Sequence, residues 1–203
     1  LHCLDAFAAE KTGHPWEDLV VGLAVLCHDL GKPDTTVRDD KGVIRSLEHE
    51  KRGVRVTEDF LGRMTSHRKL LKEVTPLVAE HMRPTQLFQA EASDAAVRRL
   101  AARVGRIDRL VRVARADVFG RTPLPADDYP AGDWLLEEAR RLGIESRPPE
   151  PLVLGRHLMA LGRKPGPEFG RMLDRCYEAQ LAGKFTTEEQ GIRYAEQLLR
   201  NPE

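Results

Sequence analysis

The chain has 203 residues, 41% hydrophobic and 32% charged, which predicts one folded domain with at most a small appendage rather than a disordered chain. Basic and acidic residues both number 32, which excludes a uniformly basic nucleic-acid-binding surface. The sequence shows no membrane-length apolar stretch, no secretory signal pattern and no CxxC motif among its three cysteines. We therefore expect a cytoplasmic protein without a disulfide framework or a membrane partner.

Helical periodicity dominates the first thirty residues. It predicts a helix over 1–12 that ends before a glycine, and a second helix over 17–30. Residues 19–27 are apolar on all sides, which predicts a central, buried helix that ends at Gly31. Leu1 already lies within a helical pattern, so we expect the chain to be a fragment of a longer protein.

The middle of the chain continues as helices after one interruption. Residues 33–46 break the helical period and predict a loop or a small hairpin. Helical patterns then cover 48–64, 66–81 and 93–119. Ser66 and Ser93 are the expected N-caps, with a kink or split at Pro76 and a break near Gly105.

A proline-rich joint at 147–151 is the expected internal boundary. It follows a loop over 121–132 and a helix over 133–142, and it precedes a short helix over 155–161. Two further helices complete the chain, the last opening with the capping-box pattern Thr186-x-x-Glu189. The predicted fold class is all-α, with a helical bundle over 1–146 and a small helical region over 152–203.

The pair His28-Asp29 follows the most hydrophobic helix. A carboxylate buried there requires a cation, because an unpaired buried charge is very costly. A divalent metal would satisfy both side chains, since imidazole and carboxylate groups are good ligands for first-row metals. The alternative is structural: Asp29 caps the next turn and His28 hydrogen-bonds a carbonyl group.

Three more potential ligands follow at helix ends. His49 and His81 lie where side chains of apolar-periodic helices can converge, and Asp117 falls on the inward edge of its helix. Each histidine alone is more often structural, but the ordered set favours a shared pocket. The remaining histidines are expected to be structural: His2, His14, His67 and His157.

This ordered set resembles the HD phosphohydrolase superfamily. The resemblance implies that His28 and Asp29 are the metal-binding and catalytic doublet, and that Lys32 contacts phosphate. It also implies that His49 and His81 bind a second metal and that Asp117 is the final ligand. The metal is Mn, Ni, Co, Zn, Fe or Mg on this interpretation. A bound divalent ion lowers the pKa of water from about 15.7 toward 7 and so supplies hydroxide.

Longer motifs resemble the C-terminal portion of bacterial tRNA nucleotidyltransferases, the CCA-adding enzymes and related poly(A) polymerases. They are Leu-His-Cys-Leu-Asp at 1–5, Cys-His-Asp-Leu-Gly-Lys-Pro at 27–33, Gly-Arg-His-Leu at 155–158, Lys-Pro-Gly-Pro at 164–167 and Glu-Ala-Gln-Leu-Ala-Gly at 178–183. Two departures are expected. The first metal histidine of the family would precede Leu1, with His2 one helical turn further on, and the nucleotidyltransferase head is absent.

Arginines gather between residues 95 and 116, where seven stand against one acid. Many fall opposite the apolar stripe and predict an exposed basic ridge, which suits an RNA backbone. The alternative is a solvated face that pairs with acids such as Glu137, Glu138, Asp127 and Asp128. The predicted RNA contacts are Arg99, Arg103 and Arg106, with Arg163 and Lys164 in the turn before a helix.

Three functions are compatible with these features. The first is metal-dependent hydrolysis of a phosphomonoester, a 2′-nucleotide or a 2′,3′-cyclic phosphodiester, linked to tRNA 3′-end processing. The second is a non-catalytic body that binds tRNA or other RNA for a separate catalytic head. The third is another HD nucleotide phosphohydrolase, against which the C-terminal turn and helix argue. The sequence leaves the oligomeric state open.

Overall fold

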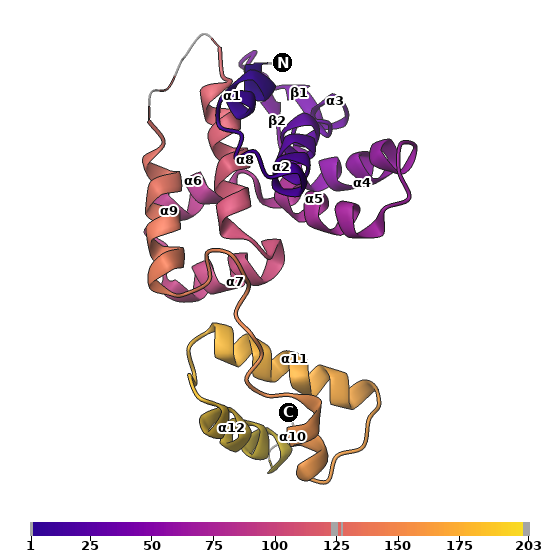
Figure 1. The fold of residues 1–203 in the computed structure, drawn as a ribbon, viewed down its shortest axis with the longest axis vertical. Coiled ribbons are helices and arrows are strands. Elements are labelled where there is room, and N and C mark those ends of the chain that lie inside the picture. Colours follow the sequence, from indigo (N-terminus) through magenta and orange to yellow (C-terminus); the bar gives the residue numbers. More distant parts are fainter. Residues whose placement is uncertain (1, 123–125, 127, 201–203) are drawn as a thin grey trace.

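A computed structural model of the protein describes residues 2–122, 126 and 128–200. It is almost entirely helical, and the all-α prediction is confirmed (Figure 1). The elements are α1 (His2–Ala9), α2 (Pro15–Cys27), α3 (Lys32–Thr35), β1 (Thr36–Arg38), β2 (Ile44–Ser46), α4 (His49–Gly62), α5 (Arg68–Glu80), α6 (Arg83–Gln89), α7 (Asp94–Val104), α8 (Ile107–Phe119), α9 (Pro130–Arg141), α10 (Gly155–Ala160), α11 (Pro167–Leu181) and α12 (Glu188–Arg200).

The helices form two lobes, with α1–α9 in the upper lobe of Figure 1 and α10–α12 in the lower one. Helices α2, α5 and α8 pack together at the centre of the upper lobe. Val21 of α2, Leu77 of α5 and Leu110 of α8 are completely buried there. This core fixes the ends of the same three helices in one place, and those ends carry the candidate site.

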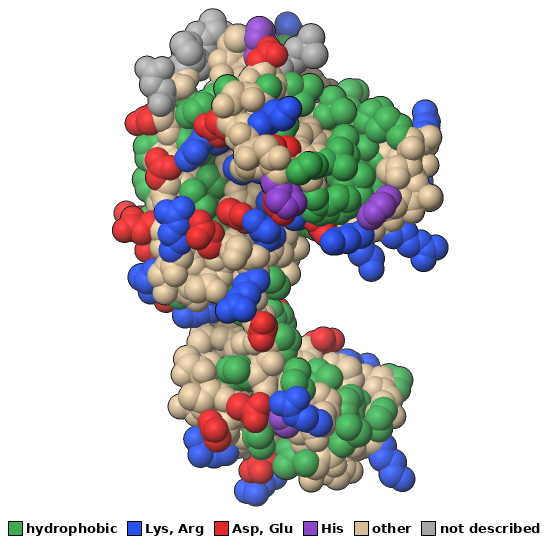
Figure 2. All heavy atoms as spheres, in the orientation of Figure 1, with side chains coloured by type: hydrophobic (Ala, Val, Ile, Leu, Met, Phe, Trp, Pro, Cys, Tyr) green, Lys and Arg blue, Asp and Glu red, His purple; other side chains and the backbone are tan. Residues whose placement is uncertain are grey.

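Helix α2 is less enclosed than its composition predicts. Its buried face is formed by Val20, Val21 and Ala24, but Leu19 and Leu26 are 45% and 43% exposed. The expectation of burial on all sides is therefore wrong for one side of α2. In Figure 2 hydrophobic surface gathers around this part of the upper lobe, whereas acidic and basic side chains intermingle over α9 and its neighbours.

Several helix ends differ by a residue or more from the predictions. The N-cap of α5 is His67, not Ser66: its Nδ1 accepts a hydrogen bond from the backbone N–H of Leu70 at 3.2 Å. Pro76 lies inside α5 without splitting it. Before α12, the Thr187 hydroxyl accepts a hydrogen bond from the Gln190 backbone N–H, and the Gln190 side chain accepts one from the Thr186 backbone N–H, in place of the predicted pair Thr186 and Glu189. The break at Gly105 is present, with φ at +74°, a conformation that glycine tolerates best.

Residues 33–46 adopt both helical and hairpin structure. The single turn α3 leads into an antiparallel pair in which Thr36 faces Ser46 and Arg38 faces Ile44. In the connecting turn, Asp39 accepts hydrogen bonds from the backbone N–H groups of Lys41 and Val43. The hairpin ends directly before α4, so it sets where that helix begins.

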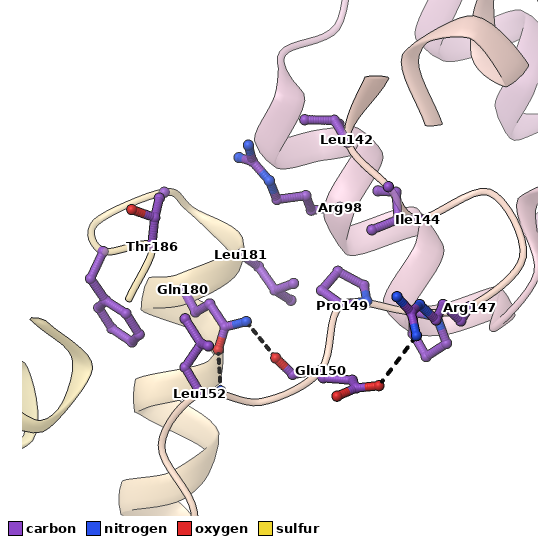
Figure 3. Close-up of a pocket in the computed structure, with 14 residues that line it drawn as sticks. Arg98, Leu142, Ile144, Arg147, Pro149, Glu150, Leu152, Gln180, Leu181 and Thr186 are labelled. Atoms are coloured by element: carbon purple, nitrogen blue, oxygen red, sulfur yellow. Dashed lines mark hydrogen bonds and ion pairs between the residues drawn. The ribbon is translucent and has the colours of Figure 1, made fainter. Parts of the chain in front are cut away.

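The lower lobe has a separate hydrophobic cluster that includes Leu158, Cys176 and Ala195. The segment between the lobes lines a pocket of about 360 Å³, drawn in Figure 3. Here the Gln180 side chain accepts a hydrogen bond from the Leu152 backbone at 2.9 Å and donates one to the Glu150 carbonyl at 2.7 Å. Among the described residues, no helix is long and apolar enough to span a membrane.

Candidate metal centre

The structure brings the predicted ligands together from four helices. His28 directly follows α2, His49 opens α4, His81 directly follows α5 and Asp117 lies in the last turn of α8. His28 Nε2 lies 3.3 Å from Asp29 Oδ2 and 3.5 Å from Asp117 Oδ1. Asp29 Oδ1 lies 3.4 Å from His49 Nε2. The ring centres of His49 and His81 are 5.3 Å apart.

The three histidine rings are oriented in the same way. Each Nδ1 contacts the carbonyl oxygen three residues earlier, at 2.7 Å for His28, 2.8 Å for His49 and 2.8 Å for His81. A carbonyl only accepts, so each Nδ1 carries the hydrogen and neutral imidazole leaves its lone pair on Nε2. This hydrogen bond is the one that commonly orients metal-binding histidines.

Close backbone packing places His49 beside Asp29. A methyl group added at Gly31 would lie 2.1 Å from the His49 carbonyl oxygen, so only glycine fits there. Glu48, just before α4, has φ at +57° and ψ at +22°. This left-handed conformation is uncommon for a residue with a side chain and is concentrated at functional sites.

The ligand atoms form two groups of three. Cys3, His28 and Asp117 form one, Asp29, His49 and His81 form the other, and the atoms within each group lie within 4.8 Å of one another. Asp29 connects the groups, because one of its oxygens faces His28 and the other faces His49. A carboxylate in this position can bridge two cations.

The two carboxylates of the site favour a positive charge between them. Burial opposes a charge on His28, but the Asp117 and Asp29 carboxylates outweigh it and raise the pKa of His28 to about 10. Burial also opposes ionisation of Asp29, yet His28 and Lys32 lower its pKa to about 2. Burial lowers the pKa of His81, which favours its neutral, ligand-competent form.

The donor set fits a divalent metal ion. His28, His49 and His81 are only 5%, 7% and 3% exposed. Within the described part of the chain, the buried His28 Nε2 has no hydrogen-bond partner. An oriented imidazole nitrogen that is unsatisfied between two carboxylates is what a bound cation would complete.

The centre opens into a pocket of about 380 Å³. Lys32 lies at its edge and pairs with Asp29 at 2.7 Å, while Arg121 pairs with Asp117 at 2.6 Å. Lys32 is among the site residues predicted from the sequence, whereas Arg121 and Cys3 are not. The signal for Arg121 was its spacing, since it follows Asp117 by one helical turn.

Comparison with known proteins places this site in a family. The HD domain model matches residues 6–120, which contain every predicted metal ligand. The chain belongs to the HD domain family.

Relatives of this HD-domain chain include an A-adding tRNA nucleotidyltransferase of Deinococcus radiodurans, 30% identical over 96% of this chain and 45% of the relative. A CC-adding tRNA nucleotidyltransferase of Thermus thermophilus is 29% identical over 87% and 39%. A multifunctional CCA protein of Stenotrophomonas maltophilia is 35% identical over 60% and 30%. The chain thus spans less than half the length of these curated relatives. The predicted resemblance is confirmed, and no solved structure matches the chain.

The arginine-rich segment of the HD-domain chain is paired with acids rather than left as an open ridge. Arg99 pairs with Glu178, Arg103 with Glu80 and Arg106 with Asp108. Arg109 is 7% exposed and contacts Glu17 and Glu73, each at 2.6 Å. Asp108 lies within the segment itself, and the other acids come from other elements. None of them is among the four acids predicted from the sequence, of which Asp127 lies outside the described residues.

The two basic side chains in the turn before α11, unlike those of the arginine-rich segment, are not paired with acids in the described structure. Within the described residues, the structure shows neither a hydrogen bond nor an ion pair for the side chain of Arg163 or Lys164, although the Arg163 backbone N–H donates to the Leu158 carbonyl at 3.0 Å. Both line a shallow pocket with Phe169. Helix α11 then begins at Pro167 without a side-chain cap at Gly166. Their proposed contact with RNA stays a prediction.

The other histidines of the HD-domain chain mostly serve local structure. His14 and His67 accept hydrogen bonds from backbone N–H groups at the starts of α2 and α5. His157 likewise accepts one from the Leu154 backbone at 3.2 Å. These contacts give a structural reason for each of the three residues away from the metal centre.

Proposed function

We propose that the chain is a metal-dependent phosphohydrolase domain that acts on a phosphate ester. The observation that carries the proposal is the position of Asp29, which belongs to the ligand group of His49 and His81 and also lies 3.3 Å from His28 Nε2 in the other group. A surface ion-pair network would not need three buried histidines that are each oriented by a contact between Nδ1 and a backbone carbonyl. The HD family assignment supports the same chemistry.

The roles of the side chains follow from their charges. His28, Asp29, His49, His81 and Asp117 would hold the metal, which supplies hydroxide at neutral pH and neutralises phosphoryl oxygens when bound. The pKa of the Asp117 carboxyl is held far below its usual range by His28 and Arg121, although burial opposes this, so it stays an anionic ligand.

Two cationic side chains are placed to bind the substrate. Lys32 and Arg121 line the same pocket as the ligands and are 45% and 59% exposed. Their ammonium and guanidinium groups can donate hydrogen bonds to phosphoryl oxygens, with the planar guanidinium matching two oxygens at once. We propose a 2′,3′-cyclic phosphodiester, a 2′-nucleotide or a phosphomonoester as substrate, with Mn, Ni, Co, Zn, Fe or Mg as the metal.

The test is hydrolysis of 2′,3′-cyclic AMP by protein supplied with each metal, with bound metal measured in parallel. His28→Ala and Asp29→Ala should lose both metal and turnover. Asp40→Ala, at an exposed position in the hairpin turn, should retain both. A wild-type chain that binds no metal, or binds metal and hydrolyses none of the three ester classes, would contradict the proposal.

A second function, binding of tRNA, is favoured by the unpaired cations before α11. Two of the relatives carry the name tRNA nucleotidyltransferase, and most of the chain matches each of them. We propose that 152–203 is an RNA-binding region beside an HD domain over 1–146; 201–203 lie outside the described residues. Intact tRNA binding without metal or turnover would favour this role alone.

A further inference from the structure

We infer that Cys3 is an additional, thiolate ligand of the metal centre, which makes the group Cys3, His28 and Asp117 selective for thiophilic divalent cations such as Zn²⁺. This inference rests on the proposed metal-binding function and adds a ligand to it. It also distinguishes the two groups of ligands, because the group around Asp29 offers only imidazole and carboxylate.

The position of Cys3 is set by the packing of α1 on α8. A methyl group added at Gly120, just after α8, would lie 2.5 Å from the Cys3 Sγ and 2.5 Å from its backbone nitrogen. The absence of a side chain at Gly120 therefore lets the thiol lie beside the end of α8, where Asp117 is found. Cys3 and Gly120 both line the pocket of the metal centre.

The neighbouring His28 gives independent evidence for a ligand at this point. His28 is only 5% exposed, and its Nδ1 is used by the Val25 carbonyl. Its Nε2 lies 3.3 Å from Asp29 and 3.5 Å from Asp117 but makes no hydrogen bond to any described residue. The Cys3 Sγ, a His28 ring nitrogen and an Asp117 oxygen lie within 4.8 Å of one another. The thiol is thus one of three potential ligand atoms in this group, together with the buried His28 nitrogen and an Asp117 oxygen.

The ligand atoms of Cys3, His28 and Asp117 need to move only slightly closer together to bind one metal ion. Ligand atoms on one tetrahedral zinc lie roughly 3.5 Å apart, which His28 Nε2 and Asp117 Oδ1 already match, so the Cys3 Sγ must approach by at most about an ångström. Cys3 is only partly buried. Metal binding would release the thiol proton to solvent and form a sulfur–metal bond. Zinc and cobalt gain from such a soft ligand, whereas manganese prefers oxygen and nitrogen donors.

The test uses Co²⁺ as a spectroscopic probe on the reduced chain. Wild-type protein should show a thiolate-to-cobalt charge-transfer band in the near ultraviolet. Cys3→Ala should lose this band, and Cys176→Ala, which removes a buried cysteine of the lower lobe, should keep it. In chelator competition, Cys3→Ala should weaken Zn²⁺ binding by at least about tenfold and leave Mn²⁺ binding unchanged.

The outcomes separate this inference from the function on which it rests. Bound Co²⁺ without a charge-transfer band in the wild type overturns the role of Cys3 and leaves the metal site standing. Equal weakening of Zn²⁺ and Mn²⁺ binding in Cys3→Ala shows a packing role and also overturns it. A wild-type chain that binds no divalent metal overturns both proposals.

Discussion

Gly31 and His49 meet through their backbones at the edge of the metal centre. A methyl group at Gly31 would lie 2.1 Å from the His49 carbonyl oxygen and 2.6 Å from the Gly53 backbone nitrogen. Because Gly31 follows Asp29 by two residues and His49 opens α4, this contact sets the spacing of two proposed ligands. The metal centre therefore depends on a residue with no side chain.

Substitution of this glycine should disturb both folding and metal binding. Gly31→Ala forces α4 away from the turn after α2, and overpacking of this kind costs about 1–3 kcal/mol. Gly62→Ala is the matched control, since nothing lies within 4 Å of the added methyl at the end of the same helix. Urea unfolding and Mn²⁺ titration should show losses for Gly31→Ala alone. Equal behaviour of the two variants would contradict the packing argument.

The two ligand groups predict different effects of single histidine changes. His81 belongs to the group with Asp29 and His49, and His28 to the other. We expect the wild type to bind two equivalents of Zn²⁺ and His81→Ala to bind one. His14→Ala, which alters only the cap of α2, should still bind two. Elemental analysis after gel filtration measures the ratio, and one equivalent in the wild type would refute the two-ion arrangement.

Much of the proposed centre is visible in the sequence because its ligands occur at helix ends. His28, His81 and Asp117 each sit where an apolar-periodic helix terminates, and periodicity locates such ends well. Cys3 is not predicted, because its approach to the site depends on tertiary structure. Cys3 reaches the site through the close approach of α1 to Gly120, which is a tertiary contact between residues far apart in the chain.

Local sequence patterns likewise predict some features of the fold, whereas others depend on tertiary contacts. The all-α class and the break at Gly105 follow from local patterns, whereas the seven-residue α6 is too short to give a clear period. Helical phase predicts an exposed ridge for the arginine-rich segment, because it does not reveal the acidic residues with which these arginines pair. Glu17 and Glu73, which meet the buried Arg109, lie 92 and 36 residues away.

Removal of the buried guanidinium should destabilise the chain strongly. Arg109→Met removes the cation that lies 2.6 Å from both Glu17 and Glu73. Arg106 stays beside Glu17 and Trp16 beside Glu73, but breaking a pair of this kind still costs about 3 kcal/mol. Arg99→Met is the control, because its pair with Glu178 is exposed and contributes at most about 1 kcal/mol. Denaturant unfolding compares the two variants. A loss below that of the control would show that solvent compensates the two acids.

Acidic pH should weaken the ion pairs that Arg109 forms with Glu17 and Glu73. A hydrogen bond from Arg109 lowers the pKa of Glu17, although burial opposes this. Burial also opposes ionisation of Glu73, but hydrogen bonds from Arg109 and Trp16 lower its pKa. Groups with lowered folded pKa stabilise the fold above about pH 4.5, and this stabilisation is lost as pH falls through the folded values. We expect stability to fall less steeply between pH 5 and about pH 3 in Arg109→Met than in the wild type. Parallel slopes would contradict the assignment.

The cations before α11 should matter more for RNA than those of the arginine-rich segment. Arg163→Ala and Lys164→Ala remove charges that have no acidic partner in the described structure, whereas Arg103→Ala removes one already held by two contacts to Glu80. Each lost phosphate contact should reduce the slope of log K against log salt by about 0.7–0.9. Filter binding of tRNA across a salt series measures it. We expect the slope to change for Arg163→Ala and Lys164→Ala and to stay constant for Arg103→Ala; the reverse order would move the RNA-binding surface to α7.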